Sequence, residues 1–263
     1  MTTPPEDPVP GVGTSPSTKE SDAFDAQITT ASLETLPELL RDPRFGEEHL
    51  LLLLGRADLP APLFEEMIKR RDWLRNYKVK RAIVFHVNVP RPLAPRLLRD
   101  LHLMDLVKLA NAPAAPPGVR RAAEENLIGQ LPRLPVGQKI ALARQASAQV
   151  LGALLAEGHK QVVPPALDNP RLTEAQVLKT LDREKLGSAV LPAISRHSRW
   201  ACLTGVRLAL LRHSQLPLEA AIRLLTHLST GELRSVASQG NLSAALRRHL
   251  AHEIARHAAA SRD

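Results

Sequence analysis

Apolar residues recur along the chain with the period of an α-helix. Leu218, Ile222 and Leu225 are spaced i, i+4 and i+7 and form one apolar stripe, and Leu224 and Leu228 form a second stripe beside it. Because two apolar stripes suit a helix that is covered by neighbours on both sides, this pattern predicts stacked helices. From about residue 33 onwards, short segments of this kind follow one another, separated by Pro, Gly, Asn, Asp or Ser.

The periodicity predicts an all-α fold. Leu and Ala dominate the apolar residues and aromatic residues are 3% of the chain, which favours helices over strands. Thr173 and Ser229 each stand three residues before Gln176 or Glu232, the spacing of a helix capping box. The expected helices lie near 119–130, 137–146, 148–168, 173–183, 187–197, 200–213, 217–228, 230–238 and 242–258.

One long segment of the chain is present twice, and the two copies match at a constant offset, the repeat offset, which takes Trp73 to Trp200. The predicted copies span about 36–127 and 163–254, and further matched pairs include Val79/Val206, His86/His213 and Pro90/Pro217. Because the two tryptophans recur while the charges around them do not, we interpret both as buried packing residues. Dividing the repeat offset by three gives helix pairs at roughly 40-residue intervals, the period of HEAT or armadillo units.

These observations predict an α-solenoid (superhelix) of stacked antiparallel helix pairs, HEAT/armadillo-like, in which each unit covers the apolar face of the next. Residues 31–260 are expected to form this single α-helical repeat domain. Residues 1–30 are rich in Pro, Ser and Thr, with five acidic residues against Lys19, and they are expected to be a disordered acidic tail that ends at most in a short helix near Phe24.

Two segments carry a resemblance to a known family. The sequence V-R-L-A-L-L-R-H-S-Q-L-P-L-E-A-A-I-R-L-L from Val206 to Leu225 resembles bacterial HEAT-like and leucine-rich-repeat-variant proteins, and D-N-P-R-L-T-E at 168–174 is similar to their Asn-Pro turn. The resemblance covers about residues 33–258 and implies a solenoid that presents a binding surface, with no catalytic residues. His86 and His213 stand where that family usually has the turn Asn, and we expect them to close helix C-termini, where positive charge is favoured.

The chain is basic, with a net charge of +8 and a pI near 10.1. A basic body attracts nucleic acid, anionic lipid or an acidic protein surface, although solvation alone also explains such charge. Several basic positions recur between the copies and are expected either to line one face of the solenoid or to cap helix C-termini. These pairs are Arg44/Arg171, Arg56/Arg183, Lys69/Arg196, Lys80/Arg207, Arg96/Arg223, Arg120/Arg247 and Arg121/Arg248.

The segment from Lys69 to Arg81 is the sharpest candidate for a binding surface. Seven of its thirteen residues are basic, and Trp73 and Tyr77 are interleaved with them. Basic residues neutralise phosphates and exposed aromatic rings stack on bases, whereas a solvated helix junction with a buried Trp73 is the plainer interpretation. The candidate surface residues are Lys69, Arg70, Arg71, Arg75, Tyr77, Lys78, Lys80 and Arg81.

No motif in the sequence predicts a catalytic centre, a metal site, a cofactor or a small-molecule substrate. His252 and His257 are one residue too far apart for the H-E-x-x-H zinc motif, and phosphate-binding glycine loops are absent. Cys202 is the single cysteine, so a disulfide within the chain is excluded and a cytoplasmic location is expected. The longest apolar run, Leu50–Leu54, is too short to span a membrane, and the N-terminus lacks the features of a signal peptide.

The sequence therefore favours a non-enzymatic scaffold that binds a protein partner through its solenoid surface. A nucleic-acid-binding HEAT-like protein with a basic groove is the alternative. A partner-specific regulator or a lyase-type accessory enzyme is a third class that the residues leave open.

Overall fold

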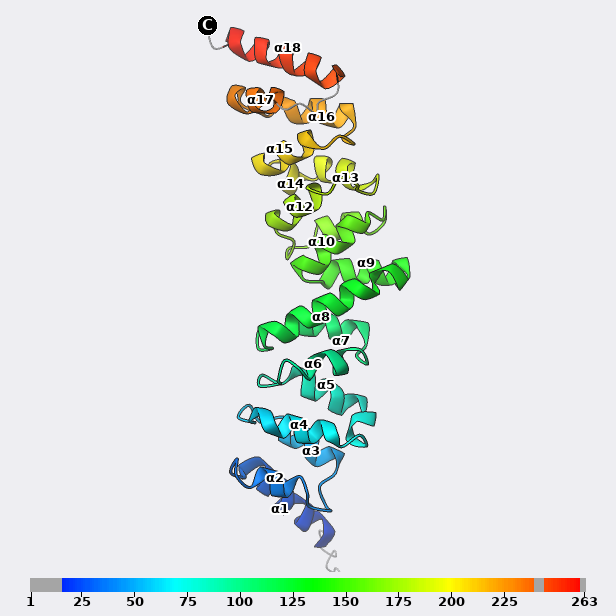
Figure 1. The fold of residues 1–263 in the computed structure, drawn as a ribbon, viewed down its shortest axis with the longest axis vertical. Helices are drawn as coiled ribbons and strands as arrows, with labels where there is room; N and C mark the ends of the chain where they lie inside the picture. The colour runs from blue at the N-terminus through cyan, green and yellow to red at the C-terminus, as the bar shows by residue number, and fades with distance from the viewer. Residues whose placement is uncertain (1–15, 239–243, 261–263) are drawn as a thin grey trace, which may run out of the picture. The chain divides into compact units, whose positions relative to one another are not determined.

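A computed structural model describes residues 16–238 and 244–260 of the chain (Figure 1). All regular secondary structure in these two ranges is helical, which confirms the predicted all-α class. The chain divides into two compact units. The first comprises residues 1–97 and 114–116, and the second comprises residues 98–113 and 117–263.

The first unit is built from short helices. Within it, α3 contacts both α1 and α5, and η1, a single 3₁₀ turn, contacts α4 and α5. The elements are α1 (Pro16–Thr30), α2 (Leu36–Leu39), α3 (Glu47–Leu53), α4 (Ala61–Lys69), η1 (Trp73–Arg75), α5 (Tyr77–Phe85) and α6 (Ala94–Leu98), the last residue of which already belongs to the second unit.

The N-terminal region differs from the expected disordered tail over 1–30. Residues 16–30 form α1, whereas residues 1–15 lie outside the described part of the chain. Phe24 is 5% exposed and Ile28 is fully buried, because α1 packs on α3. Phe24 and Ile28 thus give a segment of polar overall composition an apolar face that packs on the rest of the unit.

The second unit contains most of the longer helices. Its elements are α7 (Leu103–Ala110), α8 (Pro117–Gln130), η2 (Leu131–Arg133), α9 (Val136–Gln145), α10 (Ala148–Glu157), α11 (Val163–Leu167), α12 (Glu174–Leu181), α13 (Val190–Arg196), α14 (Ser198–Ala201), α15 (Thr204–Arg212), α16 (Leu218–Leu225), α17 (Thr230–Ala237) and α18 (Ala244–Ala260).

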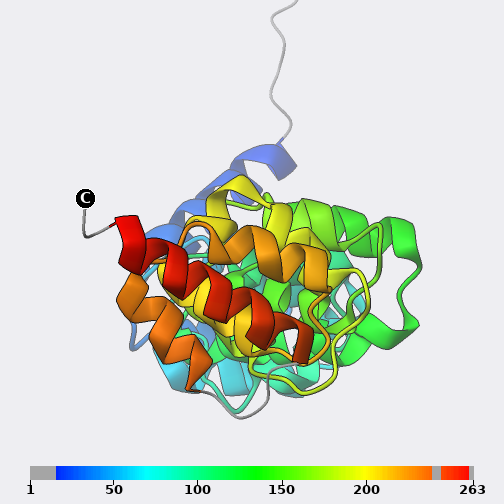
Figure 2. The same cartoon turned by 90° about the horizontal axis from the view of Figure 1, so that it is seen from above.

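Helices of the second unit form two rows. In row A, α7, α9, α11, α13, α16 and α18 each contact the next member, and in row B the same holds for α8, α10, α12, α15 and α17. The rows pack on each other, as α17 and α18 show in Figures 1 and 2. Successive row B helices begin at Pro117, Ala148, Glu174, Thr204 and Thr230. These starts are closer together than the roughly 40-residue interval expected for helix pairs, so that expectation is wrong.

The repeat offset is visible in the helix boundaries. Helices α7 (Leu103–Ala110) and α17 (Thr230–Ala237) begin and end at matched positions, as do α5 (Tyr77–Phe85) and α15 (Thr204–Arg212). We count one helix step for each passage from a helix to the next along the chain, leaving out the single-turn elements η2 and α14. Nine such helix steps lead from α7 to α17. Because nine is odd, α7 lies in row A and α17 in row B.

Two expected helices are each divided in the structure. The segment 148–168 breaks at Gly158, which ends α10 with a φ of 72°, a left-handed conformation that favours glycine. A Cβ atom at Gly158 would also lie 2.6 Å from the Cα atom of Gly187, so the two loops approach closely only because both residues are glycine. The segment 200–213 breaks at Leu203, where extended backbone separates α14 from α15.

Both tryptophans are buried, which confirms their interpretation as packing residues. Trp73 is 5% exposed and Trp200 is 1% exposed. The Trp200 Nε1 atom donates a hydrogen bond of 2.9 Å to the backbone oxygen of Leu167, so this ring also ties α14 to the end of α11. Neighbouring matched positions such as Val79 and Val206 are fully buried as well.

Candidate functional site

The segment from Lys69 to Arg81 forms the junction between α4 and α5 of the first unit. Lys69 is the last residue of α4, and Arg75 ends η1. Asn76 then starts α5, because its Oδ1 atom accepts a 2.9 Å hydrogen bond from the backbone nitrogen of Lys78. This cap turns the chain and places Tyr77, Lys78, Lys80 and Arg81 on the first turns of α5.

Most of the basic side chains at this junction face solvent. Lys69, Arg70, Arg71, Arg75, Lys78 and Arg81 are exposed, whereas Tyr77 and Lys80 are half-buried. The Arg81 guanidinium lies 5.2 Å from the centre of the Phe85 ring. In the described part of the chain, Arg71, Arg75 and Lys78 make no side-chain hydrogen bond or ion pair, so their charges are available to a partner.

Trp73 lies beneath these charges. Its ring is 5.7 Å from the ring of Phe45 between centres, and the Arg70 guanidinium covers it at 4.4 Å. Arg199 covers Trp200 in the same way at 4.2 Å, and it also donates hydrogen bonds to the backbone oxygens of Asn169 and Leu172. A buried and covered ring presents no face for stacking on a nucleic-acid base.

A pocket of about 210 Å³ opens beside Trp73. Lys69 and Arg70 line it, so the structure brings these two candidate residues together, while the candidates on α5 lie outside the pocket. Arg41 and Glu66 stand at its edge with 3.6 Å between Nη2 and Oε1. The remaining lining residues are Leu40 and Trp73.

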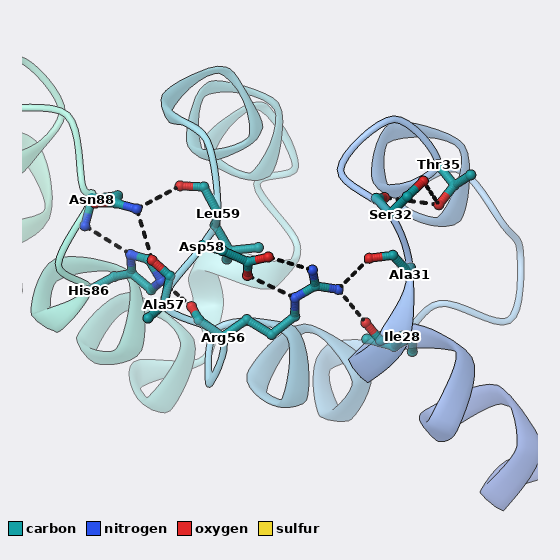
Figure 3. Close-up of polar contacts among 10 residues, drawn as sticks. All are labelled: Ile28, Ala31, Ser32, Thr35, Arg56, Ala57, Asp58, Leu59, His86 and Asn88. Atoms are coloured by element: carbon teal, nitrogen blue, oxygen red, sulfur yellow. Dashed lines mark hydrogen bonds and ion pairs between the residues drawn. The ribbon is translucent and has the colours of Figure 1, made fainter.

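Several of the recurring basic residues serve the fold. Arg56 donates hydrogen bonds to the backbone oxygens of Ile28 (3.1 Å) and Ala31 (2.8 Å) at the end of α1, and its Nη2 atom lies 2.7 Å from Asp58 Oδ2 (Figure 3). The hydrogen bond from Arg56 holds the pKa of the Asp58 carboxyl below its usual value. Arg44 pairs with Asp42 at 2.9 Å and lowers the pKa of that carboxyl by its hydrogen bonds.

The expectation that recurring basic residues line one face is wrong for two of the pairs. Arg120 and Arg121 lie on α8 in row B, and their matches Arg247 and Arg248 lie on α18 in row A. The odd number of helix steps between matched helices causes this change of row.

Turn side chains tie several loops to an earlier loop, a feature that was not predicted from the sequence. The His86 Nδ1 atom accepts a 3.1 Å hydrogen bond from the backbone nitrogen of Asn88, and His86 Nε2 bonds the backbone oxygen of Arg56 at 2.5 Å (Figure 3). Asn169 is bonded in the same way: its Oδ1 atom accepts a hydrogen bond from the backbone nitrogen of Arg171, and its Nδ2 atom donates one to the backbone oxygen of Ala143. A common signal would have been Asn or His at these turns, 26 to 31 residues after the partner segment.

His86 and His213 occupy the C-caps of α5 and α15, as predicted, but for a different reason. In each ring Nδ1 accepts a hydrogen bond from a backbone N–H, so Nδ1 carries no proton, and Nε2 donates to the backbone oxygen of Arg56 or Arg183. The rings therefore act as hydrogen-bonding groups that join the turn to the preceding loop, a role that does not require a positive charge at the helix end.

Comparison of the chain with protein-family models, with curated proteins and with solved structures finds no match. Among the described residues, no group of three His, Cys, Asp or Glu side chains is placed to hold a metal ion, and Glu253 pairs with Arg256 at 2.6 Å. The side chain of His257 lies outside the described part. No helix in the described ranges is long and apolar enough to cross a membrane.

Proposed function

We propose that this protein is a non-enzymatic helical-repeat scaffold that binds an acidic surface of a protein partner. The observation that carries the proposal is the set of exposed cations between α4 and α5, where Arg71, Arg75 and Lys78 have no partner among the described residues. Unpaired surface charge of one sign speeds association with a surface of opposite charge and favours it over wrong partners.

The scaffold that presents this surface is proposed to be a HEAT-like α-solenoid, as the resemblance of Val206–Leu225 implies, with repeating units shorter than the roughly 40 residues of HEAT or armadillo repeats. Support comes from the second unit, in which short helices alternate between two rows and contact their sequence neighbours. Such units are stabilised mainly by the next unit along the chain, which leaves long exposed surfaces for binding.

A protein partner is favoured over single-stranded nucleic acid because the junction lacks an exposed aromatic platform. Trp73 is buried under Arg70, and Tyr77 is half-buried. Proteins that bind single strands combine a basic groove with rings on which bases stack. The basic residues alone still suit a phosphate backbone, so nucleic acid is the second outcome that an experiment must separate.

The test is affinity capture from the native cell with and without nuclease, using the wild-type chain and two triple variants. The first variant is Arg71→Glu, Arg75→Glu and Lys78→Glu. The control reverses three exposed cations elsewhere, Arg133→Glu, Lys160→Glu and Lys179→Glu.

We expect a specific protein to be captured after nuclease treatment, and its recovery to fall on the order of tenfold with the first variant only, because that variant opposes an acidic surface with like charge. Recovery that disappears after nuclease treatment assigns the surface to nucleic acid. Equal losses with both triple variants reduce the effect to net charge and contradict the proposed surface.

A further inference from the structure

Three arginines from three helices of the second unit line one pocket of about 410 Å³. Arg196 ends α13, Arg207 lies in α15 and Arg223 lies in α16. Figure 1 labels these three helices. The other lining residues are Ser195, Ala201, Cys202, Leu224 and His227. No carboxylate is among these lining residues, so the charged side chains that line the pocket are all basic.

Arg207 is held in one position at the wall of this pocket. It is half-buried, and it donates hydrogen bonds to the backbone oxygens of Ala201 at 2.7 Å, His227 at 2.6 Å and Cys202. All three acceptors are neutral, so they orient the guanidinium without cancelling its charge. The carboxylate of Glu232 interacts with Arg207 through its charge, but it is held by hydrogen bonds from the backbone nitrogen and hydroxyl of Ser229 and forms no ion pair with Arg207.

The other two arginines add charge that is little compensated. Arg196 is exposed and makes no side-chain hydrogen bond or ion pair with any described residue. Arg223 lies 3.8 Å from Glu219, and the two side chains are 49% and 82% exposed, so solvent screens this contact. The pocket therefore concentrates positive charge from three directions, which favours an anion at its centre.

The matched positions of the first copy distinguish the basic residues of this pocket from cations that are scattered over an ordinary surface. The matches of Arg196, Arg207 and Arg223 are Lys69, Lys80 and Arg96, so the basic character is kept at all three positions. The match of His227 is Asp100. The second copy thus keeps the three cations and has an imidazole where the first copy has a carboxylate, so one negative charge fewer stands beside them.

We propose that this pocket binds the phosphate group of a small phosphorylated ligand. Arginine is suited to phosphate because its planar guanidinium donates parallel hydrogen bonds to two oxygens. The pocket volume lies in the range of roughly 300–1,000 Å³ that small-molecule sites occupy. The site is separate from the Lys69–Arg81 surface, which belongs to the first unit.

Cys202 provides the readout, because it is the single cysteine of the chain, is exposed and lines the pocket. The full-length protein is alkylated with iodoacetamide in the presence of sodium pyrophosphate, inorganic phosphate or sodium chloride at equal ionic strength. Pyrophosphate at several times its dissociation constant should slow the reaction about fivefold, since the rate follows the unoccupied fraction. Chloride should have no such effect.

The variant Arg196→Gln with Arg223→Gln removes the two arginines that serve no other described packing role, and Arg207 is left in place because it binds three backbone oxygens. The matched control is Lys160→Gln with Lys179→Gln, two exposed cations outside the pocket. We expect protection by pyrophosphate to be lost in the first variant and kept in the control, with thermal melting unchanged in both.

A second readout compares iodoacetate with iodoacetamide in the absence of ligand. The rate ratio of these reagents cancels any difference in thiol ionisation, so the arginine pair should raise it relative to free cysteine by attracting the carboxylate. Absence of protection by pyrophosphate and phosphate in the wild type would overturn the proposal. So would protection that survives in Arg196→Gln/Arg223→Gln, or protection by a phosphoserine peptide but by neither inorganic anion.

Discussion

Individual arginines serve the fold and binding in different ways. Arg56 binds backbone oxygens at the end of α1, and Arg207 binds those at the end of α14. The last carbonyls of a helix have no partner within the helix and attract positive charge, so these two cations complete helix ends. Arg71, Arg75 and Arg196 have no such role among the described residues, and each proposed binding site includes residues of this second kind.

The Arg56–Asp58 pair should make stability depend on pH in a defined direction. The Asp58 pKa lies below its ordinary value of 3.8, mainly because Arg56 donates a hydrogen bond to it. A depressed folded-state pKa gives stability that is full above 3.8 and is lost as pH falls through the folded pKa. Thermal melts at about pH 7 and about pH 3 should therefore differ less for Asp58→Asn than for the wild type.

The control for this prediction is Asp182→Asn, an exposed aspartate without a side-chain hydrogen bond or ion pair in the described part. Its melts should show the same pH dependence as the wild type. If the Asp58→Asn and wild-type melting temperatures fall equally on acidification, the pair does not contribute in the way described. Asp42 and Glu232 also have lowered pKa values from hydrogen bonds, so part of the acid sensitivity should remain in Asp58→Asn.

The two tryptophans should respond differently to the same substitution. Trp200 donates its Nε1 hydrogen to the backbone oxygen of Leu167, whereas Trp73 makes no such bond among the described residues. Trp200→Phe leaves a carbonyl without its donor, so it should cost about 1 kcal/mol more free energy of unfolding than Trp73→Phe. Urea titration measures both, and equal costs would show that the indole hydrogen bond contributes nothing net.

At the scale of elements, turn side chains fix where each loop lies. His86 reaches the backbone oxygen of Arg56, 30 residues earlier, and Asn169 reaches that of Ala143, 26 residues earlier. His and Asn each supply a hydrogen-bond acceptor for the backbone N–H two residues later and a donor for a backbone oxygen of the preceding loop. Bonds of this kind set the spacing between neighbouring loops in a way that apolar packing alone does not.

Asn should therefore replace His86 better than Ala does. The Asn side chain keeps one acceptor and one donor, whereas Ala leaves the half-buried carbonyl of Arg56 and the N–H of Asn88 without partners. We expect His86→Ala to lower the free energy of unfolding by about 1–3 kcal/mol and His86→Asn to lower it by clearly less. A stability ranking of His86→Asn at or below His86→Ala in urea titration would contradict the hydrogen-bonding role.

Sequence periodicity located helices well where start and stop signals are local. The expected helices 230–238 and 137–146 match α17 and α9 closely, because a capping box or a proline marks their starts. The break after α10 was missed although Gly158 is a local stop signal, whereas the close approach of Gly187 to Gly158 could not be predicted because the two glycines lie in different loops. The arginine pocket was missed for a similar reason, since Arg196, Arg207 and Arg223 were recognised as recurring cations without any indication that three helices bring them together.

At the scale of the molecule, residues that match between the two copies do not keep the same surface position, because an odd number of helix steps separates the matched helices. Helices α7 and α17 match in sequence position but lie in different rows of the second unit. A recurring residue therefore keeps its local role, such as burial or capping, without keeping its face. This explains why burial at Trp73 and Trp200 could be predicted from recurrence and a common basic face could not.

Contacts between neighbouring helices predict that a destabilising substitution in one helix affects mainly the helices that touch it. Leu50 in α3 and Val177 in α12 are matched, fully buried positions. Leu50→Ala should cost about 2–5 kcal/mol, and Val177→Ala should cost less because the cavity is smaller. Where stability passes from neighbour to neighbour, amide hydrogen exchange should rise mainly in the helices that contact the altered one.

For Leu50→Ala these helices are α1 and α5, and for Val177→Ala they are α10 and α15. Hydrogen exchange followed by mass spectrometry, in which peptides report on each helix, compares the two variants directly. Each variant serves as the control for the other, since the affected helices belong to different units. A uniform rise over both units in either variant would show that the chain unfolds as one cooperative block, and neighbour-to-neighbour stabilisation would then be the wrong description.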